Sequence, residues 1–280
     1  MPLHLGPLGA LRTLRGPRTD IQIEFPRQGG THVALSGAHV VDYLGSAGSF
    51  AFTWRHLPAD QADYLDALRD RHVRGPLRFV LDGWKRNRLS RSAASLGYGG
   101  RDLTGVAITS GYTEPARSWP DQAPPAGLGL RWVNWTPGSA VRLDRDRPVP
   151  VLAGEAITCS VWAWSSHTDT VRLIADYRTA EGYTDSAAGG AVTLTAGTWQ
   201  RLVLTRTPPA TTWGVSLAVM AVDRSASDSV LVLAAAQCEA ATSASAWSLG
   251  GGAPQVAVDS APLKLPRAGY VDPELTLLEV

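Results

Sequence analysis

The chain has 280 residues and a formal net charge of +1, with no cluster of basic residues. This length allows one or two domains with buried cores. Because phosphate binding needs clustered positive charge, the composition argues against a nucleic-acid partner.

The first residues, MPLHLGPLGALRTLRG, are interrupted by His4, Arg12 and Arg15, so they lack the apolar core of a signal peptide. No stretch approaches the roughly 20 apolar residues that a membrane span requires. We therefore expect a chain that starts in the cytoplasm and has no membrane span.

The N-terminal part predicts an α+β domain. Apolar residues alternate over Asp20–Phe25, Thr31–Leu35 and Ser49–Trp54, a pattern typical of half-buried strands. The period then changes to that of a helix between Pro58 and His72, which Gly75-Pro76 ends. A further strand is expected at Leu77–Leu81.

A connector rich in Gly and Pro follows, around residues 97–100 and 120–125. Beyond it, short apolar runs are separated by Gly, Pro, Ser, Thr and Asp, which predicts an antiparallel β-sandwich or jelly roll. The expected strands are Leu128–Val133, Ala156–Trp164, Thr170–Tyr177, Gly190–Leu194, Trp199–Thr205, Trp213–Val222 and Ser229–Gln237.

The C-terminal segment has only two short strands, near Gln255–Val258 and Leu275–Val280, after a glycine hinge. Two strands cannot bury a core alone, so we expect them to complete the N-terminal domain. The predicted fold is mainly β. It has a discontinuous α+β barrel of residues 1–117 and 251–280, with one helix, and an inserted jelly roll of residues 118–250.

The two cysteines, Cys159 and Cys238, both lie in apolar runs that are expected to form strands. Their spacing matches no metal motif. The favoured interpretation is a pair of small buried residues in a reducing compartment, although a cross-strand disulfide stays open.

Residues of the kinds used in catalysis form no recognisable set. The six histidines lack metal-ligand spacing, and a Gly-x-Ser-x-Gly motif is absent. Asp176, Glu181 and Asp185 could supply an acid pair for glycoside hydrolysis, but loop carboxylates are usually just solvated. We expect a chain that is not an enzyme and that has no cofactor and no metal.

Aromatic residues give the candidate binding site. Alternation places Trp162 and Trp164 opposite an aliphatic face, and the next run places Asp176 and Arg178 opposite another. If both aliphatic faces form the core, these four residues share the outer face of the sheet. Flat rings stack on sugars and charged groups bind hydroxyls, so this set predicts a carbohydrate site. The alternative is that both tryptophans pack under a loop or against the barrel.

Three stretches of the predicted insert resemble carbohydrate-binding jelly rolls. Leu152–Trp164 resembles their G-x-x-Y-T-F-S-x-W strand, with Ile157 at the usual aromatic position, and Thr195–Leu202 resembles their G-x-W-x-x-L strand. Val230–Glu239 resembles their final Y-x-D-x-x-Q-L-E strand, but Ala replaces the Asp, which puts the family's structural calcium ion in doubt. The resemblance implies a sugar-binding fold.

The segments Ala246–Pro254 and Pro266–Val280 resemble minor tail proteins of actinobacterial siphophages. The N-terminal pattern of strands, helix and strand is similar to the belt domain of distal tail proteins. The resemblance implies a virion protein in a ring, expected to be hexameric, that joins the tail tube to the hub at the tail tip. Its jelly rolls would project outward and bind host cell-wall polysaccharide. The alternatives are a phage-tail-like injection particle and a free carbohydrate-binding accessory protein.

Overall fold

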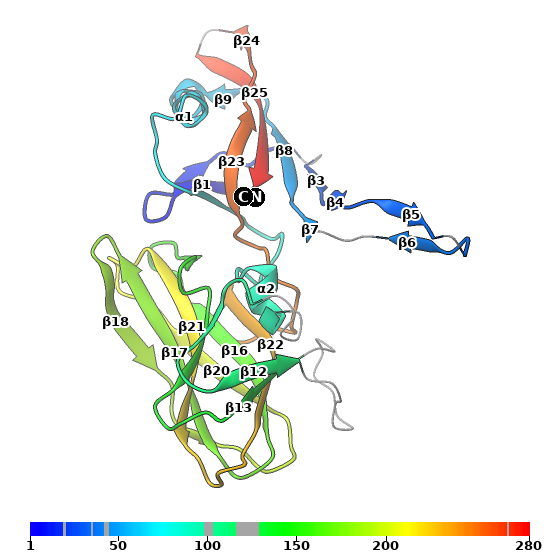
Figure 1. Cartoon of the computed structure of the whole chain (residues 1–280). Helices are drawn as coiled ribbons and strands as arrows, with labels where there is room; N and C mark the ends of the chain where they lie inside the picture. The colour runs from blue at the N-terminus through cyan, green and yellow to red at the C-terminus, as the bar shows by residue number, and fades with distance from the viewer. Residues whose placement is uncertain (19–20, 35, 42–44, 98–102, 116–128, 268) are drawn as a thin grey trace. The chain divides into compact units, whose positions relative to one another are not determined.

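The computed structural model describes residues 1–18, 21–34, 36–41, 45–97, 103–115, 129–267 and 269–280 (Figure 1). It is mainly β with antiparallel sheets, which confirms the predicted fold class. The chain divides into two compact units. Unit 1 contains Met1–Asp82 and Pro254–Val280, and unit 2 contains Gly83–Ala253.

Unit 1 is built on a sheet whose main path is β2-β1-β10-β23-β25-β8-β3, with β24 and β9 paired to β25 beside that path. Within the described residues β2 and β3 do not pair, so the sheet is open between these two end strands, where the sequence predicted a barrel. The two end strands have three residues each, too few for an extensive ladder. The strands are β1 (Leu3–Pro7), β2 (Arg12–Leu14), β3 (Gln22–Glu24), β8 (Ser49–Thr53), β9 (Leu57–Pro58), β10 (Leu77–Leu81), β23 (Gln255–Ser260), β24 (Leu263–Arg267) and β25 (Tyr270–Glu279).

The C-terminal strand β25 lies inside this sheet, between β23 and β8. Leu275 pairs with Phe52, and Leu277 pairs with Phe50. Both leucines are fully buried. This confirms the prediction that the last strand pairs with a strand from the first hundred residues.

Helix α1 (Ala59–Arg69) packs against this sheet through Ala62, Leu65 and Leu68, all of which are buried. The Tyr64 hydroxyl donates a hydrogen bond to the Leu5 carbonyl at 3.1 Å and so fixes the helix to β1. The predicted helix extended to His72, but the helix ends at Arg69 and His72 is exposed.

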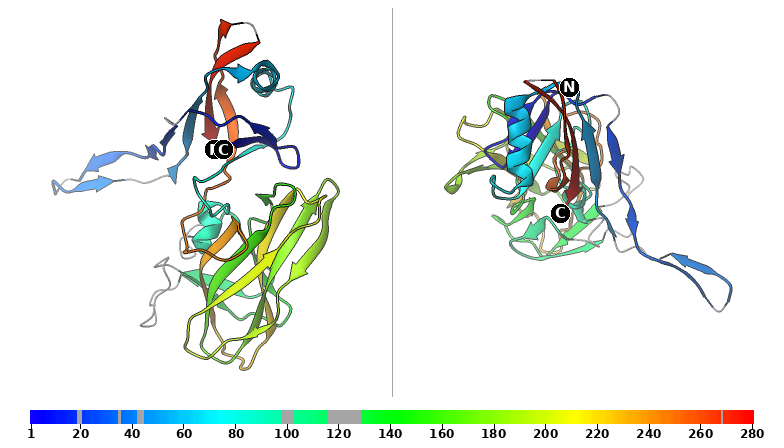
Figure 2. Two further views of the ribbon diagram at one scale, coloured as in Figure 1. Left: turned by 180° about the vertical axis from the view of Figure 1, so that it is seen from behind. Right: turned by 90° about the horizontal axis from the view of Figure 1, so that it is seen from above.

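Two short ribbons continue the β3–β8 hairpin beyond the sheet, as Figures 1 and 2 show. They are the pairs β4 (Arg27–Gln28) with β7 (Gly45–Ser46), and β5 (Thr31–Val33) with β6 (His39–Val41). Val33 is 64% exposed. An isolated two-stranded ribbon buries little apolar surface, so it is at best marginally stable by itself.

Unit 2 is a sandwich of two antiparallel sheets around one apolar core (Figure 2). The seven-stranded sheet has the order β11-β14-β21-β17-β18, with β15 and β19 at its side, and the five-stranded sheet has the order β12-β13-β22-β16-β20. The strands are β11 (Val106–Ile108), β12 (Tyr112–Pro115), β13 (Gly129–Val133), β14 (Ala140–Leu143), β15 (Val149–Pro150), β16 (Ile157–Ser165), β17 (Thr170–Thr179), β18 (Gly182–Ala188), β19 (Val192–Thr193), β20 (Gln200–Arg206), β21 (Gly214–Asp223) and β22 (Leu231–Ala240).

Unit 2 begins earlier than the sequence predicted, at residue 83 rather than 118. Strand β11 pairs with β14 and β12 pairs with β13, so both strands before residue 118 belong to the sandwich. Helix α2 (Arg91–Ala94) belongs to this unit too, and its Ser90 cap is held by the Asp144 carboxylate. Residues 98–100 and 120–125 of the predicted connector lie outside the described residues.

Cys159 and Cys238 lie opposite each other on β16 and β22, with their sulfur atoms 3.6 Å apart. Both are buried free thiols, as the favoured interpretation expected. The hydrogen bond with Cys159, together with burial, raises the pKa of Cys238 well above its ordinary value. Because the thiolate is the reactive form, the Cys238 thiol packs as an unreactive apolar group.

A buried carboxylate joins two loops of the sandwich, the β16–β17 loop and the β21–β22 loop. Asp169 accepts hydrogen bonds from the hydroxyls of Ser165, Ser225 and Ser229, and from the Ser225 backbone amide at 2.9 Å. Burial by itself would raise the pKa of Asp169, but these hydrogen bonds outweigh it and lower the pKa. Asp169 therefore stabilises the fold as an anion.

Replacing Asp169 with Asn should lower the free energy of unfolding of unit 2 by about 1–3 kcal/mol, because a charged acceptor is lost from a buried network. The wild-type contribution is present above the unfolded pKa of about 3.9 and is lost as the pH falls through the lower folded pKa. Denaturant unfolding between neutral and acidic pH measures both effects. An Asp169→Asn variant with the wild-type pH dependence would contradict this role.

The buried position of β25 generates a second prediction. Leu277→Ala should destabilise unit 1 by about 2–5 kcal/mol, because a cavity forms in its core. Hydrogen exchange resolved by segment should show faster exchange in β8, β23 and β25 and no change in unit 2. Leu278→Ala is the matched control, because Leu278 is 41% exposed on the same strand. Equal effects of the two substitutions would rule out the proposed core position.

Candidate functional site

A polar cleft of about 480 Å³ opens on the outer face of the seven-stranded sheet. Its lining residues come from neighbouring strands and the loops beside them: Thr109, Arg142, Arg145, Asp176, Tyr183, Asp185 and Ser186. The alternation of side chains along β17 explains which residues face the cleft. One set points into the core: Val171, Leu173, Ala175 and Tyr177. The residues between them must therefore point outward.

The hairpin of β17 and β18 positions the aromatic wall of the cleft. Arg178 pairs with Tyr183 in the ladder, and the guanidinium carbon of Arg178 lies 3.8 Å from the ring centroid of Tyr183. The Arg145 carbonyl accepts hydrogen bonds from the Arg178 guanidinium at 3.1 Å and from the Tyr183 hydroxyl at 3.4 Å. Arg178 thus covers one face of the ring, while Tyr183 as a residue is 38% exposed.

An ion pair lies beside this wall. The Arg142 guanidinium on β14 donates a hydrogen bond to the Asp176 carboxylate on β17. Burial raises the pKa of Asp176 above its ordinary value, although the nearby charges of Arg142, Arg145 and Arg178 oppose the rise. The cleft thus offers fixed donors and a fixed acceptor, which suits a ligand with many hydroxyl groups.

A separate aromatic cluster lies on the outer face of the five-stranded sheet. Trp162 and Trp164 on β16 are partly buried there, and they pack with Trp199 and Trp247 around the buried side chain of Val232. This group of residues is called the tryptophan cluster below. These rings lie outside the main core, and three of them are only partly buried.

A β-bulge in β22 holds one edge of the tryptophan cluster. Ala235 has a φ of 52°, and the pairing of β22 with β16 shifts register at this point. The displaced Ala236 carbonyl accepts hydrogen bonds from the Trp247 indole at 3.1 Å and from the Asn87 side chain at 3.0 Å. The segment that carries Trp247 therefore folds back over this sheet.

The structure separates the four residues that the sequence grouped into one site. Trp162 and Trp164 lie on β16 of the five-stranded sheet, whereas Asp176 and Arg178 lie on β17 of the seven-stranded sheet. The predicted shared outer face is therefore wrong, because β16 and β17, although consecutive in the chain, belong to opposite sheets. Each half lies on an outer face of its own, and the binding roles of the four residues stay predictions.

Sequence reasoning missed Tyr183, Arg142 and Arg145. The strand that carries Tyr183 was not predicted, although a two-residue connection, Ala180-Glu181, links Thr179 to Gly182 and forms a hairpin. Gly182 has a φ of 105°, which favours glycine and could have indicated this turn. Arg142 is missed for another reason, because its place beside Asp176 depends on β21 lying between β14 and β17.

Among the described residues, no group of three or more His, Cys, Asp or Glu side chains is arranged to hold a metal ion. No helix in that part of the chain is long and apolar enough to cross a membrane.

No protein-family model matches the chain, and no curated protein matches it. Among solved structures, the enzymatically active domain of tailspike protein 4 from bacteriophage CBA120 is similar over 55% of this chain and 21% of its own, with 12% identity and a TM-score of 0.42. The CBM22-1 xylan-binding domain of Paenibacillus barcinonensis Xyn10C is similar over 58% of this chain and 100% of its own, with 15% identity and a TM-score of 0.40.

A third similar structure is TmCBM61 in complex with β-1,4-galactotriose, which covers 56% of this chain and 100% of its own at 11% identity and a TM-score of 0.41. With TM-scores below 0.5, these likenesses do not decide what the chain binds.

Proposed function

We propose that the chain is a structural component of a phage tail tip whose jelly-roll unit binds glycans of the host cell surface. The proposal that the chain binds glycans rests on the cleft of unit 2, where Tyr183 lies beside the ion pair of Arg142 and Asp176. A partly exposed ring can stack on the apolar face of a sugar, and the charged groups can bind its hydroxyls.

Binding without hydrolysis is the favoured chemistry. Asp176 would have to act as an acid or a nucleophile in a glycosidase, but it is already paired with Arg142. A carboxylate held in this way can orient a ligand by accepting hydrogen bonds from its hydroxyl groups. We therefore propose a lectin-like role, with no cofactor and no metal ion.

Unit 1 supports the assembly half of the proposal. Its ribbon of β4–β7 and β5–β6 lies beyond the sheet and exposes Val33. Such a ribbon gains stability when it contacts a neighbouring copy, and heterologous contacts of this kind can close a ring. We propose a ring, hexameric by the resemblance of the sequence, that contacts tail-tube and hub proteins in the virion. Several jelly rolls in one ring would turn weak sugar binding into avidity.

The cleft predicts a specific loss of binding. Tyr183→Ala should weaken binding to bacterial cell-wall polysaccharide about two- to tenfold, because one stacked ring contributes ~0.5–1.5 kcal/mol. Titration calorimetry against a panel of purified polysaccharides measures this change, and the release of reducing sugar tests for hydrolysis.

The matched control is Tyr112→Ala, because Tyr112 is 46% exposed on the other sheet of the same unit. Equal losses from both substitutions would contradict a site in the cleft. Trp162→Ala and Trp164→Ala in the same assay test the stacking that the sequence predicted on the five-stranded sheet. Losses confined to these two variants would move the sugar site to the tryptophan cluster.

The proposed ring predicts that electron micrographs of the purified full-length chain show closed rings with an axial opening. Val33→Asp should reduce the fraction of rings, because it places a charge on the ribbon where a neighbour is expected. Val203→Asp is the matched control, since Val203 is 49% exposed in unit 2. A chain that stays monomeric at every accessible concentration, alone and with tail-tube and hub proteins, would contradict the ring.

A further inference from the structure

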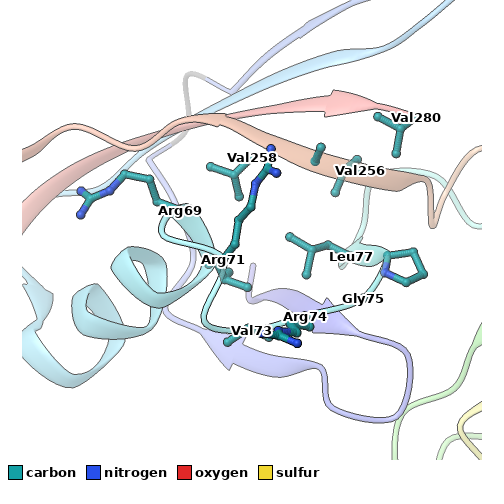
Figure 3. Close-up of a pocket in the computed structure, with 12 residues that line it drawn as sticks. Arg69, Arg71, Val73, Arg74, Gly75, Leu77, Val256, Val258 and Val280 are labelled. Carbon is teal, nitrogen blue, oxygen red and sulfur yellow. The ribbon is translucent and has the colours of Figure 1, made fainter.

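A second pocket, of about 370 Å³, lies in unit 1 between β23 and the loop that follows α1 (Figure 3). Its walls are aliphatic and include Val73, Leu77, Val256 and Val258. Figure 3 shows the Arg71 side chain extending from the loop toward β23, beside Val258. This cavity is called the β23 pocket below.

The backbone at Arg71 is unusual for an arginine. After the helix cap at Asp70, the Arg71 amide donates to the Leu68 carbonyl at 3.2 Å and the His72 amide donates to the Ala67 carbonyl at 2.9 Å. This is a Schellman motif, and Arg71 occupies its left-handed position with a φ of 59°. Glycine is favoured there, because other side chains are strained in this conformation. The left-handed conformation of Arg71 therefore lowers the stability of the fold, and it places a long cationic side chain at the pocket.

The charges around the β23 pocket are unbalanced. Arg69 also lines the pocket, and it pairs with Asp66 at 2.6 Å and with the cap residue Asp70 at 2.9 Å. In the part of the chain that the structure describes, neither Arg71 nor Arg74 has an acidic partner within 4.0 Å. Among the described residues, the exposed guanidinium groups of Arg71 and Arg74 thus line this pocket without an Asp or Glu partner of their own.

We propose that the β23 pocket binds an acidic, aliphatic peptide segment of a partner protein. An aliphatic side chain would fill the space between Val73 and Val256, and carboxylates of the same segment would pair with Arg71 and Arg74. Guanidinium groups match carboxylates in charge and geometry, because they can donate two parallel hydrogen bonds. The proposal is independent of glycan binding, because the cleft that would bind sugar belongs to the other unit.

Other ligands fit these observations less well. A purely apolar segment would leave both guanidinium groups unpaired beside it, and a small inorganic anion would leave the aliphatic walls uncovered. A nucleic acid needs a longer track of positive charge than two arginines supply. The strain retained at Arg71 is the kind of cost that is commonly kept at binding sites.

The test uses the full-length chain and a short fluorescein-labelled peptide that alternates Glu with Leu, with fluorescence anisotropy as the readout. Its counterpart with Gln in place of Glu has the same shape without charge. The Glu peptide should bind the wild type, and the Gln peptide should bind about tenfold more weakly or not at all. Arg71→Gly should weaken binding of the Glu peptide by a similar factor.

Arg71→Gly separates binding from folding, because glycine is better suited to the left-handed position. Its thermal unfolding midpoint should be equal to that of the wild type or higher, so lost binding cannot be attributed to misfolding. Arg74→Gln tests the second cation by an independent change. Arg55→Gly removes the same charge from an exposed site outside the pocket and should leave binding unchanged.

Three results would overturn the proposal. The first is no binding of the Glu peptide to the wild type at any accessible concentration. The second is equal binding of the Glu and Gln peptides, which would indicate a merely apolar groove. The third is unchanged binding in both Arg71→Gly and Arg74→Gln, which would place the contact elsewhere on the chain.

Discussion

Unit 1 depends on the pairing of β25 with β8, which joins residues from opposite ends of the chain. Leu275 and Leu277 are fully buried, and they pair with Phe52 and Phe50 in the middle of the sheet. Those phenylalanines pack in turn on Phe79 of β10, at centroid distances of 5.6 and 4.8 Å. The core is therefore complete only after the chain has passed through unit 2. Loop-closure entropy grows slowly with length, so a folded insert can be tolerated at this position.

Unit 2 shows how a sandwich divides its surface between two different kinds of chemistry. Strand β16 ends at Ser165 and β17 begins at Thr170, in the opposite sheet. Both strands direct alternate residues into one core, so their other residues lie on opposite outer faces. The tryptophan cluster lies on the five-stranded sheet, and the Arg142–Asp176 pair with Tyr183 lies on the seven-stranded sheet. The two faces can therefore serve different partners, or one face can bind while the other supports packing.

Two residues of this chain affect its stability in opposite directions: the backbone conformation of Arg71 lowers it, and the hydrogen bonds of Asp169 raise it. Arg71 adopts a left-handed conformation at a helix end that glycine would suit better. Asp169 shows the opposite balance, since a buried carboxylate is stabilised by four hydrogen bonds from three serines. The Asp169 network joins loops of the jelly roll, whereas the Arg71 side chain has no Asp or Glu partner among the described residues of unit 1. This contrast suggests that Arg71 is retained for a contact with another molecule.

Local patterns in the sequence determined most of the strands, the helix α1, the mainly β fold class and the return of the last strand to the first part of the chain. Those features depend on periodicity, and on the inability of two short strands to bury a core. Alternation also determined that Trp162 and Asp176 would point away from the core. It could not determine that they lie on opposite sheets, nor that Arg142 stands beside Asp176, because those relations depend on strand order. Strand order, the open edge of unit 1 and its boundary at residue 82 were decided only by the tertiary structure, through pairings between residues far apart in the chain.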